Sequence, residues 1–353
     1  MKRILAFLSH GENELISSQS AHHNSLQTGK QFFVGNHKLT VEGIIAEGGF
    51  GVVCRVRSQD GRVFAMKRTC VNNKSDLATV KREVTIVSSL SHKNILKYID
   101  STITETEPGI YEVLLVTSFY PGSVAQVLTE RRQKNQRFLE TEVLRVLCDV
   151  CEAVSRLHHC ETPIIHRDLK IENILIDGQK NFVLCDFGSA TSRVLHPGKH
   201  GPLRCQEEIE KHTTLAYRAP EMVDLYTNGG QPIGPPVDIW ALGCVVYGLC
   251  FFSLPFGANA LAIQTGQFVI PDHSSYSPRL HKLIKFMLSV EALKRPDIFQ
   301  VASLAFSLLG RPNPVLNVNV SWDPLSHSPS FRAFSPSSLA LLIPTSFKVI
   351  SEK

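Results

Sequence analysis

The chain has 353 residues, more than one typical hydrophobic core requires, so we expect two lobes or domains. Charged residues make up 20% and hydrophobic residues 43%, a globular composition that excludes a mostly disordered, collagen-like or polytopic membrane protein. The net charge of +5 suits an anionic ligand but lacks the dense basic stripe of a nucleic-acid-binding protein, so we expect no nucleic-acid partner.

Cysteine usage and apolar segments indicate the compartment. The nine cysteines are scattered through a long chain, a pattern typical of reduced, packed thiols rather than of a disulfide framework. The apolar run Ile4–Leu8 is too short for a signal peptide, and no stretch reaches the eighteen apolar residues of a membrane span. We therefore expect a cytoplasmic protein without a membrane span.

The first part of the chain is predicted to be rich in strands. Residues 1–37 are polar and show no periodicity, which predicts a flexible N-terminal extension. Apolar residues then recur at helical spacing over 76–90. Alternating apolar runs separated by glycine turns predict strands at 39–45, 52–56, 62–67 and, as a pair, 96–117. Together these elements form a small lobe over about 38–120.

The rest of the chain is predicted to be mainly helical. The clearest helix spans 142–160, where steps of 4, 3, 4 and 3 place five apolar residues on one face: Val143, Leu147, Val150, Val154 and Leu157. Helix and loop signals continue to about residue 311, which defines a large lobe over about 121–311. Residues 312–353 carry many Pro and Ser residues, so we expect a flexible tail.

A glycine-rich segment, Ala46 to Val53, lies between two predicted strands. Glycine lets the backbone approach phosphate oxygens and offers its N–H groups as donors. The segment departs from the G-x-G-x-x-G pattern because Ala46 occupies the first glycine position. Taken alone, it is compatible with a nucleotide-binding loop or with an ordinary hairpin turn.

Three further motifs follow in order and point to phosphoryl transfer. His166–Asn173 reads H-R-D-L-K-I-E-N, the kinase catalytic-loop pattern, in which Asp168 fits a proton acceptor for a hydroxyl group. Asn173 and Asp186, the latter in Asp186-Phe187-Gly188, fit oxygen ligands for Mg²⁺. Ala219-Pro220-Glu221 completes the series. Upstream, Lys67 ends an apolar strand, and Glu83 lies sixteen residues later in the predicted helix. An ion pair between them would direct Lys67 toward phosphates, but the spacing alone does not establish it.

From about residue 38 to 310 the chain resembles the eukaryotic serine/threonine protein kinase family. The resemblance implies an α+β, bilobal protein kinase fold, with ATP and Mg²⁺ bound between the lobes. It assigns the catalytic roles to Lys67, Glu83, Asp168, Lys170 and Asn173. It assigns Mg²⁺ binding to Asn173 and Asp186. It assigns ATP binding to Ile45, Ala46, Glu47, Gly48, Gly49, Phe50, Gly51, Val53, Ala65, Lys67, Thr117, Ser118, Phe119, Tyr120, Leu175 and Asp186.

The same resemblance gives supporting roles to other residues. Lys170 resembles the lysine with which serine/threonine kinases steady the transferred phosphate, and Thr214 the threonine that contacts Asp168 and Lys170. Asp238 resembles the aspartate that supports the catalytic-loop backbone, and Arg295 the arginine that pairs with Glu221. Thr117 resembles the gatekeeper residue at the back of the ATP site.

Several stretches resemble more closely the Numb-associated kinase family, in its adaptor-associated branch. They include Cys70–Asn73, Thr162–Asp168, Leu184–Thr191 and Thr213–Tyr226, and the branch shares the Ala46 departure. The resemblance implies a kinase that phosphorylates a threonine of the clathrin adaptor medium subunit, in peripheral association with endocytic coats. It also implies an extra helix after Glu221, at roughly 223–229 and beyond.

Three other interpretations of the sequence remain open. A kinase of the same fold could act on a protein other than the adaptor, or on a small molecule. A pseudokinase scaffold would bind partners without catalysis, but such proteins usually lack one of the five residues Lys67, Glu83, Asp168, Asn173 and Asp186, all of which are present here.

Overall fold

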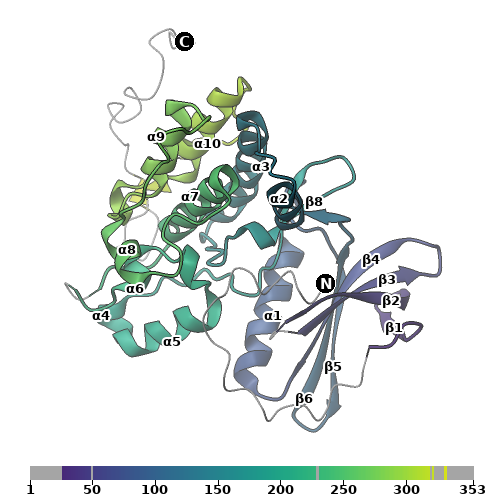
Figure 1. Cartoon of the computed structure of the whole chain (residues 1–353). Coiled ribbons are helices and arrows are strands. Elements are labelled where there is room, and N and C mark those ends of the chain that lie inside the picture. The colour runs from purple at the N-terminus through teal and green to yellow at the C-terminus, as the bar shows by residue number, and fades with distance from the viewer. Residues whose placement is uncertain (1–25, 49–50, 228–229, 319, 322–329, 332–353) are drawn as a thin grey trace, which may run out of the picture.

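The computed structural model describes residues 26–48, 51–227, 230–318, 320–321 and 330–331, and it divides into two lobes (Figure 1). A six-stranded antiparallel sheet and one helix form the small lobe, and helices dominate the large lobe. The expected α+β, bilobal fold is confirmed.

The sheet of the small lobe has the strand order β1-β2-β3-β4-β6-β5. Alternation along the central strands gives it two different faces. Cys54, Met66 and Val116 are paired across neighbouring strands, and each is completely buried. They point into a small-lobe core that is separate from the core of the large lobe. The strands are β1 (Gln31–Val34), β2 (His37–Gly48), β3 (Gly51–Ser58), β4 (Val63–Val71), β5 (Tyr98–Glu107) and β6 (Ile110–Ser118).

The expectation of a flexible extension over residues 1–37 is wrong for its last twelve residues. β1 forms a tight hairpin with β2, and its Phe32 and Val34 are buried in the small-lobe core. Gly35 closes the turn with a φ of 53°, and a Cβ atom there would lie 1.9 Å from the carboxylate of Asp100 on β5. The strand escaped prediction because it has only four residues and only two of them face the core. Residues 1–25 lie outside the described residues.

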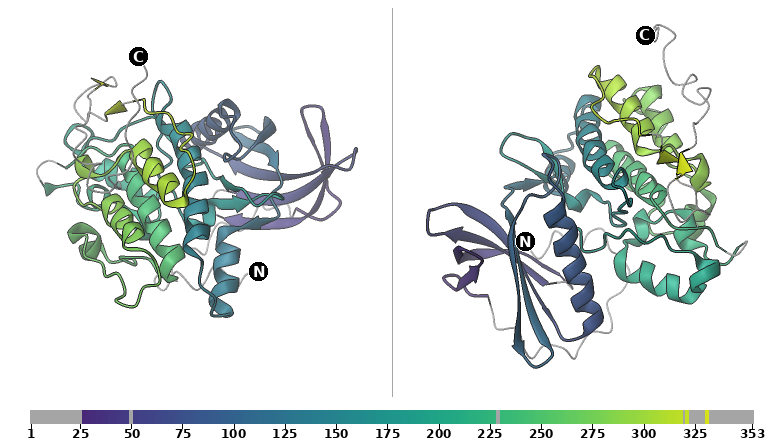
Figure 2. Two further views of the ribbon diagram at one scale, coloured as in Figure 1. Left: turned by 90° about the horizontal axis from the view of Figure 1, so that it is seen from above. Right: turned by 180° about the vertical axis from the view of Figure 1, so that it is seen from behind.

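Helix α1 (Lys74–Ser89) covers part of the other face of the sheet, between the sheet and the large lobe (Figure 2, right). It begins at Asn73, whose side chain accepts a hydrogen bond from the backbone N–H of Asp76. Leu77 and Val87 are buried on its inner side, and Glu83 is buried among them. The helix predicted for 76–90 is confirmed.

The large lobe is built around α7 (Pro236–Phe251), which is apolar on all sides and buried along most of its length. The predicted helix 142–160 corresponds to α3 (Glu140–His158), and all five of its predicted core residues are buried. α3 packs on α7 and on α10 (Ile298–Leu309). The other helices of this lobe, apart from those near the functional site, are α2 (Val124–Gln133), α8 (Ala260–Thr265) and α9 (Pro278–Met287).

A short sheet forms the edge of the large lobe that faces the small lobe. It consists of β7 (Gly122–Ser123), β8 (Ile174–Ile176) and β9 (Phe182–Leu184), with β8 in the centre. β9 also joins the small lobe, because the backbone of Leu184 donates to Asn94 and accepts from Leu96. The segments that precede β8 and follow β9 therefore lie where the two lobes meet (Figure 1).

The extra helix expected after Glu221 lies elsewhere. α6 (Pro220–Val223) is short, and the described residues between it and Pro236 contain no α-helix. Gly230, Pro232, Gly234 and Pro235 in this segment all disfavour helix formation. The additional helices precede Glu221 instead, as α4 (Pro197–His200) and α5 (Pro202–His212).

The sequence of α5 does contain helix signals, although the helix was not predicted. Pro202 occupies its first turn, Lys211 and His212 its last, and Cys205, Ile209 and His212 form a buried stripe at steps of 4 and 3. Because the helix is short, this stripe has only three members and is concealed among polar residues.

The predicted tail starts later than residue 311. Val315 is buried against the large lobe, and its backbone N–H donates a hydrogen bond to the side-chain oxygen of Asn313. β10 (Val320–Ser321) and β11 (Ser330–Phe331) pair with each other, and most of residues 319–353 lie outside the described residues. Among the described residues, no helix is both long and apolar enough to cross a bilayer.

Candidate functional site

The sheet register collects several of the predicted ATP-binding residues on one face. Val53 is paired with Lys67, and Ala65 is paired with Thr117. Residues directly opposite each other, and residues two apart on one strand, point to the same side of a sheet. These four side chains therefore share the face opposite the small-lobe core, on the side that carries α1.

The glycine-rich segment joins β2 to β3 above this face. Ala46, Glu47 and Gly48 end β2 and are exposed, as is Ile45 at 41%. Gly51 has a φ of 128°, and a Cβ atom there would lie 2.3 Å from the carbonyl oxygen of Arg68, so the position requires glycine. Gly49 and Phe50 lie outside the described residues.

Lys67 is held between two carboxylates. Its Nζ atom lies 2.7 Å from Oε1 of Glu83 on α1 and 3.6 Å from Oδ1 of Asp186. Burial works to lower the pKa of Lys67, but the two carboxylates outweigh it and raise the pKa overall. Burial likewise works to raise the pKa of Asp186, and Lys67 reverses that effect. The lysine is thus a fixed cation and Asp186 a fixed anion at neutral pH.

The segment that links the lobes follows β6. Ser118 ends that strand, and its N–H donates to the carbonyl of Lys97. The guanidinium carbon of Arg55 lies over the ring of Phe119, 5.2 Å from the ring centre. The hydroxyl of Tyr120 accepts a hydrogen bond from the backbone N–H of Lys97. All three predicted residues here are half-buried, as is Leu175 on β8.

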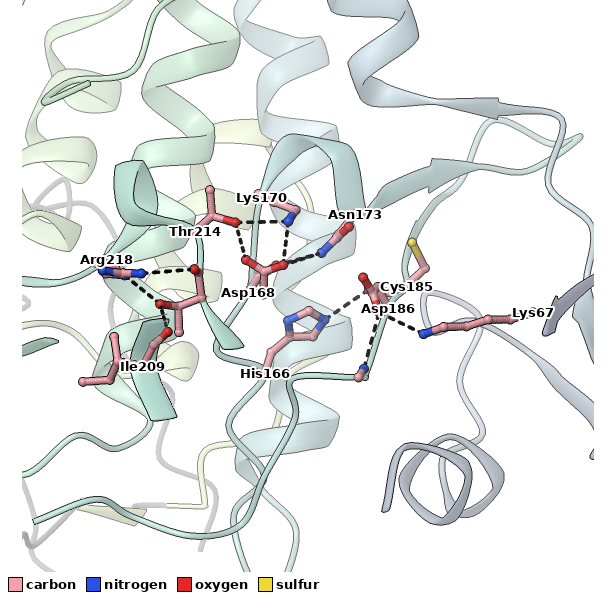
Figure 3. Close-up of polar contacts among 12 residues, drawn as sticks. Lys67, His166, Asp168, Lys170, Asn173, Cys185, Asp186, Ile209, Thr214 and Arg218 are labelled. Carbon is pink, nitrogen blue, oxygen red and sulfur yellow. Dashed lines mark hydrogen bonds and ion pairs between the residues drawn. The ribbon is translucent and has the colours of Figure 1, made fainter. Parts of the chain in front are cut away.

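Asp168 is the centre of a second cluster, in the loop before β8 (Figure 3). Its Oδ1 atom accepts a hydrogen bond of 2.7 Å from the hydroxyl of Thr214, and its Oδ2 atom accepts one of 2.6 Å from Lys170. Lys170 also lies 3.1 Å from the Thr214 hydroxyl. Asn173 donates to the backbone oxygen of Asp168 at 2.9 Å. The four residues expected to meet here are brought together.

The backbone of this loop is fixed from below by Asp238, at the start of α7. Its carboxylate is completely buried and accepts the N–H groups of His166 and Arg167, at 2.8 and 2.9 Å. His158 of α3 contacts the same carboxylate at 2.9 Å. Arg167 has a φ of 68°, a conformation that L-residues rarely adopt, so these bonds offset a local strain of about 1 kcal/mol.

The Asp186-Phe187-Gly188 segment connects the two clusters. Phe187 is buried and packs edge-on against the ring of His166, whose Nε2 atom lies 3.2 Å from the carbonyl oxygen of Cys185. Asp186 has a φ of 60°, and its side chain points toward Lys67 (Figure 3). Burial raises the pKa of the Cys185 thiol, which makes this cysteine unreactive.

Beyond this segment, α5 contacts both lobes. Glu208 accepts a 2.8 Å hydrogen bond from Nη1 of Arg167, and Lys211 pairs with Asp76 at the start of α1 at 2.7 Å. Thr213 follows α5, donates to the carbonyl of Ile209 and accepts from Arg218. The contact between Glu208 and Arg167 was not predicted from the sequence, because the two residues are 41 positions apart.

The oxygen atoms available near Asp168 suit magnesium and a nucleotide. Asn173 donates from its Nδ2 atom to the Asp168 backbone, and no hydrogen bond to its side-chain Oδ1 atom is found among the described residues. Lys67 keeps Asp186 ionised. Mg²⁺ is commonly bound through one or two such protein oxygens together with phosphate oxygens. The residues present therefore fit Mg²⁺ bound with a nucleoside triphosphate, with Lys67 available to the phosphates.

The comparisons with known proteins agree with this geometry. A family model described as protein kinase domain matches residues 39–307. The chain is 40% identical over 273 residues to serine/threonine-protein kinase sel-5 of Caenorhabditis elegans, an alignment that covers 76% of this chain and 25% of that protein. It is 35% identical over 292 residues to a probable serine/threonine-protein kinase of Dictyostelium discoideum, covering 81% and 26%.

A relative in Schizosaccharomyces pombe, serine/threonine-protein kinase ppk30, is 34% identical over 294 residues, covering 82% of this chain and 30% of that protein. The chain thus aligns with about a quarter to a third of the length of these curated relatives. The family model, in contrast, matches well over half of the chain itself. The protein belongs to the protein kinase domain family.

Proposed function

We propose that the protein is a serine/threonine protein kinase, which transfers the γ-phosphoryl group of ATP to a hydroxyl group of a protein. The arrangement around Asp168 carries the proposal, because one oxygen of its carboxylate accepts from Thr214 and the other from Lys170. Both contacts fix the carboxylate in one orientation. A carboxylate held in this way is suited to orient an incoming hydroxyl group.

In this proposal each part of the site has one task. Asp168 orients the attacking hydroxyl and accepts its proton, and Lys170 balances negative charge on the group in transfer. Lys67, held by Glu83, binds phosphate oxygens of the nucleotide. Mg²⁺, held by Asp186 and Asn173, would neutralise the phosphates and orient them.

Lys170 and Thr214 support a protein hydroxyl as the acceptor. Thr214 belongs to the segment that ends at Glu221, and its contact with Asp168 joins that segment to the catalytic loop. In the family that the sequence resembles, this lysine and threonine are typical of serine/threonine kinases. The names of the relatives, all serine/threonine-protein kinases, support the same class.

For the substrate we propose a threonine of the clathrin adaptor medium subunit. The support is the resemblance to the adaptor-associated branch in stretches such as Leu184–Thr191 and Thr213–Tyr226. The same resemblance supports a cytoplasmic location, in peripheral association with endocytic coats. A kinase of this fold with another protein substrate is the alternative.

The test is transfer of labelled γ-phosphate from Mg-ATP to the purified medium subunit, beside a generic basic protein. Asp168→Asn is the blank, because it keeps the size of the side chain but removes the proton acceptor. Lys67→Ala is a second blank in the small lobe. Threonine-directed labelling of the medium subunit by the wild-type chain alone is the expected result.

The other results each discard a defined part of the proposal. Labelling of the generic protein alone keeps the kinase and discards the adaptor subunit as its substrate. Labelling of neither protein, with ATP still bound, contradicts the enzyme and favours a scaffold. Near-wild-type turnover by Asp168→Asn contradicts the assignment of the proton acceptor.

A further inference from the structure

A groove in the large lobe lies apart from the proposed ATP site. It encloses about 90 Å³ and is formed where the end of α3, the start of α7 and the start of α10 meet. This volume suits an aliphatic side chain rather than a cofactor, since small-molecule sites commonly hold ~300–1,000 Å³. Leu293, which lines the groove, is 60% exposed. The walls are mainly apolar and include Pro163, Pro235, Pro236, Ile239 and Phe299.

The charged groups along the groove already have partners within the protein. Arg295 is paired with Glu221, and Asp297 accepts a 2.7 Å hydrogen bond from the backbone N–H of Gln300. Burial lowers the pKa of His159 to about 4, so this side chain is uncharged at neutral pH. The groove therefore favours an apolar occupant, because burying a further charge without a partner is costly.

The chain that follows α10 returns to this groove. The side chain of Asn313 donates a 2.9 Å hydrogen bond to the hydroxyl of Ser303, in the middle of α10. Val315 is buried against the large lobe, and Val318 lines the groove together with Phe299, near the start of α10. The segment thus runs back along α10 from the end of the helix toward its start, and it reaches the groove at Val318.

The pairing of β10 with β11 brings the chain back to the same place. Val320, two residues after Val318, is the register partner of Phe331. Residue 331 therefore lies beside the chain where it leaves the groove. Residues 332–353 lie outside the described residues, but the point from which they start is fixed by this pairing. They begin next to the groove.

We propose that the apolar run at residues 339–343 docks in this groove of the same chain. The run reads Leu-Ala-Leu-Leu-Ile and is bounded by Pro336 and Pro344, and residues 333–347 carry no charged side chain. It begins eight residues after Phe331, and eight extended residues span up to about 26–29 Å, so the run can reach the groove. A tether of this length gives a local concentration on the order of millimolar, so a modest apolar contact suffices.

Docking of the run covers two supports of the large lobe. Arg295, on one wall of the groove, holds Glu221, and His158, on another, contacts the carboxylate of Asp238 at 2.9 Å. Excluding water from their surroundings strengthens such ionic contacts. We therefore expect the docked run to stabilise the large lobe. This effect goes beyond the proposed phosphoryl transfer and does not depend on it.

The first experiment places the photoreactive residue benzoylphenylalanine in the full chain, in place of Leu293. After irradiation, mass spectrometry of the monomeric product should find crosslinks to residues 333–347. The matched control carries the same photoreactive residue in place of Leu139, which is 67% exposed. Leu139 lies at the start of α3, about 28 Å along the helix from His158, which lines the groove. The control should give no crosslink to residues 333–347.

The second experiment compares two double variants of the full chain. Leu341→Asp with Leu342→Asp places charge within the run, and Ser337→Asp with Ser338→Asp adds the same charge just before it. The leucine variant should melt roughly 2–4 °C below the wild type. Hydrogen exchange of the amides of residues 292–299, which line the groove, should be faster by roughly fivefold or more. The serine variant should match the wild type in both measurements.

Three results would overturn the proposal. Crosslinks from position 293 that appear only in a dimer-sized product would make a second copy of the chain the occupant of the groove. Crosslinks that avoid residues 333–347 would exclude the run as the occupant. Equal melting temperatures and equal amide exchange in the two double variants would show that the run does not contact the groove. Both experiments work without phosphoryl transfer, so failure of the proposed function leaves them decisive.

Discussion

Arg295 and Glu221 form an ion pair with two hydrogen bonds of 2.6 Å inside the large lobe, where their side chains are 0% and 2% exposed. The guanidinium of Arg295 also lies 5.1 Å from the ring centre of Trp240 and donates to the backbone at both ends of this site. This pair fixes the end of the segment that begins at Asp186. It confirms the contact implied by the family resemblance.

The first prediction concerns the stability that depends on this pair. Glu221→Gln leaves the arginine buried without its counter-ion, so we expect the free energy of unfolding to fall by about 3–5 kcal/mol. Urea denaturation measures the change. Glu291→Gln breaks the exposed pair of Glu291 with Lys294 and should cost less than about 1 kcal/mol. Equal effects of the two substitutions would contradict the prediction.

The second prediction concerns the pair of Lys67 and Glu83. Glu83→Gln removes the charge that holds the lysine, so we expect kcat/KM for ATP to fall by roughly 10-fold or more. Glu112→Gln removes a carboxylate that pairs with Arg68 of the same sheet at 2.6 Å and should leave transfer unaffected. Steady-state kinetics at varied ATP concentration compares the two. A Glu83→Gln protein as active as the Glu112→Gln protein would refute the role of Glu83.

The third prediction concerns β1, the strand that was not expected from the sequence. Phe32 is 7% exposed in the small-lobe core, whereas its neighbour Phe33 is 68% exposed. Phe32→Ala should lower the free energy of unfolding by about 3–5 kcal/mol, and Phe33→Ala should have a much smaller effect. Thermal denaturation of the two variants decides whether β1 belongs to the folded lobe. Similar melting temperatures would show that the strand contributes little.

The fourth prediction concerns Thr117, which is buried on β6 and shares a sheet face with Ala65 and Lys67. A small side chain there predicts space behind the nucleotide site. ATP-competitive inhibitors that carry a bulky group at this end should bind Thr117→Met roughly 10-fold or more weakly than the wild type, because the larger side chain overfills the space. Competition binding measures the ratio. Equal affinities would mean that Thr117 does not border the site.

The fifth prediction concerns stability in mild acid. Burial, with help from His158 and Arg156, lowers the pKa of His159 from its ordinary 6.5 to about 4 in the folded state. The unfolded chain therefore binds a proton more readily than the folded chain between pH 6.5 and 4, and stability falls as the pH decreases through that range. His159→Gln should flatten the dependence of the melting temperature on pH in this window. Superimposable curves for the two proteins would contradict the assignment.

The parts of the site that could be predicted from sequence are those encoded by contiguous motifs. His166–Asn173 and Asp186–Gly188 name their residues directly, and the structure brings Asp168, Lys170 and Asn173 together as expected. The pairing of Lys67 with Glu83 required the family resemblance, because a spacing of sixteen residues between a strand and a helix has no geometry of its own. In the structure, α1 packs against β4 and brings Glu83 to Lys67.

The remaining features escaped prediction for physical reasons. The positive φ of Arg167 depends on the buried carboxylate of Asp238, 71 residues away. Glu208 is one glutamate in an acidic run, and nothing local distinguishes it from Glu207. The extra helix was expected after Glu221, although that segment is rich in glycine and proline, because its position was taken from resemblance rather than from the periodicity of Cys205, Ile209 and His212.

The Asp238 carboxylate joins α3, α7 and the catalytic loop without any atom from the small lobe. The backbone of the loop that carries Asp168 is therefore anchored within the large lobe, without contacts from the hairpin, sheet and helix of the small lobe to Asp238. Damage to the small lobe, as by Phe32→Ala, should weaken nucleotide affinity while the loop around Asp168 keeps its shape. In the proposed kinase, changes confined to the small lobe can accordingly alter nucleotide affinity without displacing Asp168.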